Sequence, residues 1–148
     1  MSKKVIISAC LLGEQCRYDG KTKKVNAILD AFKEYEIIPF CPEAPLFGTP
    51  RERISVIEID KTQKIITDET NVDVTTRLEE EIHAFCANNA EVDAIVLKSK
   101  SPSCGNGTTA VLNKRKELVG YGDGIAAKIF KKVYTDVSLK DELSYLSF

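Results

Sequence analysis

The chain has 148 residues, of which 43% are hydrophobic, so it can bury one compact core but hardly two. Lys and Arg number 21 against 22 Asp and Glu, and the net charge of -1 argues against both a broad nucleic-acid-binding surface and an acidic disordered chain. No run approaches the roughly 20 apolar residues of a bilayer span and no export signal is found, so we expect one cytoplasmic domain, residues 1–148, without membrane contact.

The first third of the chain predicts two strands with a helix between them. Val5–Ile7 is a β-branched run and predicts a buried strand. Apolar residues at helical spacing over residues 26–35 predict a helix. Glu36–Phe40 predicts the next strand, and Pro39 places it near a sheet edge because proline has no N–H to donate. The proline-rich residues 41–53 then predict a surface loop.

The middle of the chain predicts a hairpin, a helix and a third strand. Residues 55–67 alternate in polarity on either side of a short turn, which is typical of a hairpin. Thr76 followed by Glu79 forms a capping box, so a helix is expected from there onward. Ala94–Leu97 is a wholly apolar strand, and residues 98–109 after it are a loop rich in Ser, Gly and Pro.

The last third predicts a second hairpin over residues 110–119, a glycine-rich hinge at Gly120–Gly124 and a helix that begins at Ile125. Apolar strands separated by amphipathic helices are typical of α/β proteins whose central sheet is mainly parallel. We therefore predict an α/β fold: a single-domain, three-layer sandwich with a mainly parallel central sheet, plus one or two β-hairpins.

Three of the five cysteines follow predicted strands. Cys10 lies just past the first strand, Cys41 just past the second, and Cys104 in the loop after Ala94–Leu97. Because the carboxyl ends of parallel strands share one edge of a sheet, we expect the three thiols to converge in one crevice. Five cysteines without an export signal also indicate a reducing compartment, where thiols stay free for metal binding or catalysis.

Three thiolates would leave one position open on either a tetrahedral zinc ion or a cubane cluster. An open position is what a catalytic metal needs, and thiolates without histidine favour an iron–sulfur cluster. The chain contains no CxxC pair, however, so the spacing alone leaves a cluster, a structural zinc ion and plain packing open.

Two further cysteines and the single histidine are weaker candidates. Cys86 falls on the apolar face of a predicted helix, where a small core residue is expected. Cys16 lies in a loop, a position that suits a reactive, substrate-facing thiol as well as a buried structural one. His83 falls on the wetter side of its helix and is expected at the surface.

Six short motifs are distributed along the chain: Ser8–Gly13 (SACLLG), Cys16–Gly20 (CRYDG), Cys41–Glu43 (CPE), Gly48–Arg51 (GTPR), Ser99–Gly105 (SKSPSCG) and Gly122–Gly124 (GDG). Together they resemble the thiouracil desulfidase family, long catalogued as a domain of unknown function. The similarity extends from about residue 4 to residue 133, which is nearly the whole chain.

The resemblance implies a [4Fe-4S] cluster held by Cys10, Cys41 and Cys104, with the fourth iron free of protein ligands. The chain departs from the family at Ala44–Phe47, where many members are richer in glycine. Because of this departure, the resemblance does not fix the size of the pocket or the choice of substrate.

Catalytic and substrate-binding residues are also implied by the resemblance. We expect Glu43, Ser101 and Cys16 to be catalytic: Glu43 as a carboxylate base, Ser101 as a hydroxyl that contacts the substrate, and Cys16 as an additional active-site cysteine. Substrate contacts are expected at Arg17, Tyr18 and Ser103, and Ser103 could also donate to a cluster sulfur.

The reaction so implied is a non-redox desulfidation by an iron–sulfur-dependent enzyme of the hydrolase or lyase type. A thiocarbonyl of a thiouracil-like pyrimidine becomes a carbonyl and sulfide is released, with the open iron as Lewis acid. Two alternatives stay open: an iron–sulfur or metal-binding module without turnover, and a desulfidase that acts on thiolated tRNA. Family members that act on RNA resemble this chain fused to a further domain, so we favour a small thiolated pyrimidine over nucleic acid as the partner. The sequence makes no prediction of the oligomeric state.

Overall fold

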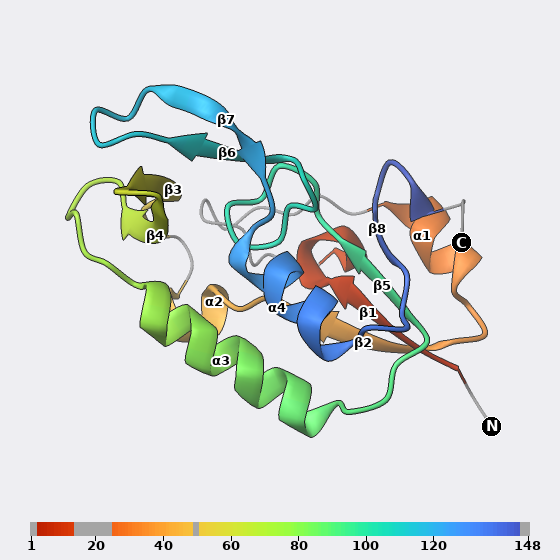
Figure 1. The fold of residues 1–148 in the computed structure, drawn as a ribbon. Coiled ribbons are helices and arrows are strands. Elements are labelled where there is room, and N and C mark those ends of the chain that lie inside the picture. Colours follow the sequence, from red (N-terminus) through yellow and green to blue (C-terminus); the bar gives the residue numbers. More distant parts are fainter. Residues whose placement is uncertain (1–2, 14–24, 49–50, 146–148) are drawn as a thin grey trace.

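The computed structural model describes residues 3–13, 25–48 and 51–145. Four parallel strands form one sheet in the order β2-β1-β5-β8 (Figure 1). The bounds of these strands are Lys4–Ser8 for β1, Glu36–Phe40 for β2, Ala94–Leu97 for β5 and Leu139–Asp141 for β8. Because β1 lies between two neighbours and is covered on both faces, its residues from Val5 to Ser8 are all buried, which accounts for its continuous apolar run.

The remaining strands form a second sheet in the order β4-β3-β6-β7. Their bounds are Ile54–Ile59 for β3, Thr62–Thr67 for β4, Thr109–Leu112 for β6 and Leu118–Gly122 for β7. Strands β3 and β4 are one antiparallel hairpin and β6 and β7 the other, and β3 pairs with β6 in parallel. Both predicted hairpins are therefore confirmed, and the pairing between them makes a sheet that neither hairpin pattern indicates by itself.

Helices cover both faces of the first sheet (Figure 1). Helix α1 (Asn26–Ala31) packs through Ile28 against Val5, Ile7 and Val96. On the opposite face lie α3 (Thr75–Asn88) and α4 (Ile125–Val133). The layers confirm the predicted α/β sandwich with its mainly parallel sheet. None of the helices within the described ranges is long and apolar enough to cross a bilayer.

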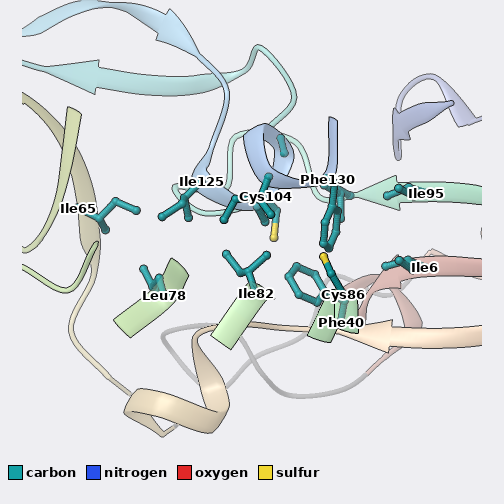
Figure 2. Packing of buried hydrophobic residues seen from close by; sticks show 14 of the residues in the cluster. Ile6, Phe40, Ile65, Leu78, Ile82, Cys86, Ile95, Cys104, Ile125 and Phe130 are labelled. Carbon is teal, nitrogen blue, oxygen red and sulfur yellow. The ribbon is translucent and has the colours of Figure 1, made fainter. Parts of the chain in front are cut away.

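A continuous apolar core joins the two sheets, as Figure 2 shows. It extends from Ile65 of β4 past Leu78 and Ile82 of α3 to the aromatic rings beside the first sheet. There the ring centroids of Phe40 and Phe130 lie 4.9 Å apart, within the range of favourable aromatic pairs. Since one core serves both sheets, the position of the second sheet relative to the first is fixed by packing.

The loop after β5 packs against a glycine. A Cβ atom at Gly124 would lie 2.5 Å from the backbone carbon of Ser103 and 2.8 Å from the backbone nitrogen of Cys104, so no larger residue fits. Gly124 donates its N–H to the Gly105 carbonyl at 2.7 Å, and Ala126 donates to the Ser103 carbonyl at 2.7 Å. The segment predicted as a hinge therefore supports the backbone of the Cys104 loop.

The same loop is held at its other end by the C-terminal turn after β8. Glu142 accepts hydrogen bonds from the Ser99 N–H at 2.6 Å and from the Ser99 hydroxyl at 2.8 Å, and its carboxylate lies 3.0 Å from Lys98 Nζ. Burial alone would raise the pKa of Glu142, but the hydrogen bonds from Ser99 and Lys98 outweigh it and leave the pKa below its usual value. Glu142 is therefore an ionised clamp on the loop that carries Cys104.

We predict that Glu142→Gln lowers the free energy of unfolding at pH 7 by about 1–2 kcal/mol, because hydrogen bonds to a charged acceptor are lost. A carboxyl with a lowered folded-state pKa stabilises the fold above its ordinary pKa of 4.5, and this contribution is lost as the pH falls through the lower folded value. Urea unfolding of both proteins at pH 7 and at about pH 3 should show the difference shrinking in acid.

Glu91→Gln is the matched control, since Glu91 is an exposed carboxylate. Its effect should stay within about 0.5 kcal/mol at both pH values. If Glu142→Gln lowers the free energy of unfolding by the same amount at the acidic pH as at pH 7, that result would contradict the role of Glu142 as an ionised clamp.

Candidate functional site

The three strand-end cysteines line one cavity of about 640 Å³ at the carboxyl edge of the first sheet. Cys10 lies in η1 (Ala9–Leu12), the short helix that follows β1, and Cys41 directly follows β2. Cys104 comes from the loop after β5. Cys10 and Cys104 are buried and Cys41 is half-buried. The three cysteines that we expected in one crevice thus line the same cavity, although they lie far apart in the sequence.

The thiol of Cys104 lies in a setting that disfavours its negative form. Burial, aided by the nearby Cys41 and Glu43, raises the pKa of Cys104 to about 12, although hydrogen bonds from Ser103 and Ser101 work in the opposite direction. A buried thiolate therefore needs a positive partner, and metal ligation supplies one by displacing the proton. The three thiols in the wall of one cavity are a donor set that an iron–sulfur cluster or a zinc ion accepts.

Within the described ranges, no three His, Cys, Asp or Glu side chains meet the geometry for holding a single metal ion. Cys10, Cys41 and Cys104 share the wall of one cavity without forming such a group.

A buried carboxylate shares the cavity with the cysteines. Glu43 is 8% exposed and precedes α2 (Ala44–Phe47), a short helix with a proline in its first turn. The hydroxyl of Ser103 donates to Glu43 Oε2 at 2.6 Å, and Arg51 Nη2 lies 3.4 Å from Oε1. The backbone N–H of Ala44 points at Cys41 Sγ from 3.5 Å. The short helix thus places Glu43 and the Cys41 sulfur beside one another.

The two serines of the loop have different roles in its hydrogen bonding. Ser101 Oγ accepts the backbone N–H groups of Ser103 at 3.3 Å and Cys104 at 3.1 Å, and it lies 3.3 Å from Ser103 Oγ, to which its own proton can be donated. Ser103 is fully buried, and its one proton is directed at Glu43. Ser103 Oγ also lies 3.6 Å from Cys104 Sγ, a contact in which either atom can be the donor. The single hydroxyl proton serves one acceptor at a time, and Glu43 is the nearer of the two.

Sequence reasoning assigned no role to Arg51, which the structure places in the cavity wall beside Glu43. The residue stands in one of the recognised motifs, but nothing in its spacing points to a carboxylate partner eight positions earlier. Lys98 also lines the cavity, where it contacts Glu142. Basic side chains therefore accompany the acidic and thiol groups of the site.

The other predicted residues fall into two groups. Cys86 lies in the apolar core, where burial raises its pKa, and His83 is exposed on α3 and is not among the residues that line the cavity. Cys16, Arg17 and Tyr18 lie outside the described residues, so their predicted roles stay predictions.

Comparisons with known proteins identify relatives of the chain along nearly its whole length. The chain is 30% identical over 151 residues to the uncharacterized protein YbbK of Bacillus subtilis (strain 168), with 95% of this chain and 97% of that protein covered. Among solved structures it is similar to the [4Fe-4S]-dependent thiouracil desulfidase TudS, with a TM-score of 0.72, 29% identity, and 99% of this chain and 95% of that chain covered. The family model described as 2-thiouracil desulfurase matches residues 5–142, and the chain therefore belongs to the 2-thiouracil desulfurase family.

Proposed function

We propose that this chain is a [4Fe-4S]-dependent desulfidase that converts the thiocarbonyl of a small thiolated pyrimidine into a carbonyl and releases sulfide. One observation carries the proposal: cysteines from three strand ends line the same cavity as a buried carboxylate. The family to which the chain belongs and the [4Fe-4S] dependence of its structural relative TudS support it.

Cys10, Cys41 and Cys104 would hold the cluster, because these thiols line the cavity and Cys104 needs a positive partner to lose its proton. Three protein ligands leave one iron without a cysteine. When bound, the cluster supplies a Lewis acid for the soft thiocarbonyl sulfur. Cys16 is kept as an additional active-site cysteine rather than a ligand.

The chemistry is a hydrolysis that balances without electron transfer. The oxygen of a water molecule becomes the carbonyl oxygen of the ring, the carbon–sulfur bond breaks, and the sulfur leaves as sulfide with the two protons of the water. Glu43 is the general base that accepts a proton from the attacking water at a carboxylate oxygen and returns it to the departing sulfur. Its burial beside the cysteines keeps this carboxylate away from bulk water.

The substrate would be oriented by two parts of the chain: the loop after β5 and the segment that contains Arg17 and Tyr18. Ser101 lines the cavity, and its hydroxyl would contact a ring oxygen or nitrogen of the substrate. Ser103 contributes by holding Glu43, as its short hydrogen bond indicates. Arg17 and Tyr18 are further substrate contacts that the family resemblance implies.

We predict that Cys10→Ala, Cys41→Ala and Cys104→Ala each lose most of the bound iron and acid-labile sulfide after anaerobic reconstitution, since each removes a cluster ligand. Cys86→Ala is the matched control, because Cys86 is a buried thiol of the core. It should keep the iron content of the original protein. Equal iron content in all four variants would show that the cluster, if formed, lies elsewhere.

We predict that Glu43→Gln keeps the iron of the unaltered protein but releases sulfide from 2-thiouracil or 4-thiouracil about 10²–10⁴ times more slowly, because a general base is lost. Sulfide release is measured under anaerobic conditions with the iron content of each sample. A variant that retains full activity would remove Glu43 from the mechanism. Loaded protein that releases no sulfide from either thiouracil would favour a binding module, and release from thiolated tRNA alone would favour an RNA substrate.

A further inference from the structure

Arg51 is a buried cation in the wall of the candidate site. Its side chain is 6% exposed, and that of its carboxylate partner Glu43 is 11% exposed. Arginine keeps its charge under all ordinary conditions, so a guanidinium removed from water needs a compensating anion close by. The Glu43 carboxylate provides that anion, with Nη2 at 3.4 Å from Oε1.

The second contact of Arg51 reaches the other end of α2. Arg51 Nη1 donates to the Gly48 carbonyl at 3.0 Å, and Gly48 ends the helix that Glu43 begins. Gly48 has a φ of +78°, a left-handed conformation that turns the chain after the helix. One guanidinium therefore contacts both ends of the short helix that presents Glu43.

Glu43 is consequently held by a different group at each oxygen. Ser103 donates to Oε2 at 2.6 Å, and Arg51 faces Oε1. Arg51 Nε is buried and has no hydrogen-bond partner among the residues that the structure describes. In the planar guanidinium group Nε and Nη2 lie along one edge, the edge that a carboxylate can engage with two parallel bonds. Arg51 thus has one further donor on the edge that faces Glu43.

We propose that Arg51 is a positioning residue that fixes the Glu43 carboxylate for catalysis, with Ser103 fixing the opposite oxygen. The inference rests on the proposed function, because it assigns Glu43 the role of general base. A carboxylate bound at one oxygen only can rotate about its side-chain torsions, and a misplacement of about 1 Å in a catalytic group can cost on the order of 10²-fold in rate. Arg51 removes that freedom.

The test compares three variants. Arg51→Met keeps the length and apolar stem of the side chain but removes charge and donors, and Arg51→Lys keeps the charge but lacks the planar fork. Arg77→Met is the matched control, because Arg77 also contacts α2: it donates to the Leu46 carbonyl at 3.3 Å and lies 5.0 Å over the Phe47 ring. Arg77 supports the same helix without touching Glu43.

The first readout is urea unfolding of the cluster-free protein, which needs no activity. If the two side chains are paired, Arg51→Met lowers the unfolding midpoint in the original chain, and its effect in a Glu43→Gln background falls to less than about half. Equal shifts in both backgrounds would overturn the pairing, and the proposal with it.

The second readout is steady-state sulfide release from 2-thiouracil by iron-loaded protein. We expect Arg51→Met to lower kcat about 10²-fold with little change in KM or iron content, Arg51→Lys to recover only part of that loss, and Arg77→Met to stay within about threefold of the original protein. Full activity of Arg51→Met, or an equal loss in Arg77→Met, would overturn the positioning role.

The two readouts separate the inference from the function on which it rests. If loaded wild-type protein releases no sulfide, the proposed function and the catalytic part of the inference fall together. The unfolding comparison still decides, in that case, whether Arg51 and Glu43 are paired.

Discussion

The parallel alignment of β1, β2 and β5 is the constraint on which the site depends. Each strand runs in the same direction, so the residues that follow Ser8, Phe40 and Leu97 leave the sheet at one edge. Cys10, Cys41 and the Cys104 loop come from these three exits. A reversed strand would carry its thiol to the opposite edge, and the cavity would lose a wall.

Burial at this edge makes each polar group dependent on another. The Arg51–Glu43 pair and the Glu142 clamp are both cases in which a charged group removed from water is compensated by a specific partner. Arg51 and Glu142 act at different places: one fixes the carboxylate, the other fixes the start of the loop that carries Cys104. The side chains of the site are therefore held in place by two kinds of interaction: the pairing of their charges and the packing of the core beneath them.

The parts of the fold that depend on local pattern could be predicted from sequence. Residues 36–40 and 94–97 form the strands predicted for them, and Pro39 lies in an edge strand because only an edge tolerates a missing N–H. Strand β8 has only three residues and too little pattern to be recognised. The parallel contact of β3 with β6 joins segments about fifty residues apart, which no local periodicity encodes.

The candidate site could be predicted in part for the same reason. Strand ends indicated where Cys10, Cys41 and Cys104 meet, and the family resemblance added Glu43 and Ser101. The Ser103 bond to Glu43 and the Arg51 contact arise from side-chain packing across loops, so sequence spacing carried no signal for them. The need for glycine at position 124 likewise follows from the backbone of another loop.

The most direct test of the account is a crystal structure of anaerobically reconstituted protein with anomalous data at the iron edge. We predict a [4Fe-4S] cluster, the group on which the structural relative depends, inside this cavity, bonded to Sγ of Cys10, Cys41 and Cys104 and with one iron free of protein sulfur. Iron bound at another place, or a fourth cysteine closing the cluster, would contradict the central claim that this cavity holds an open cluster on three thiolates.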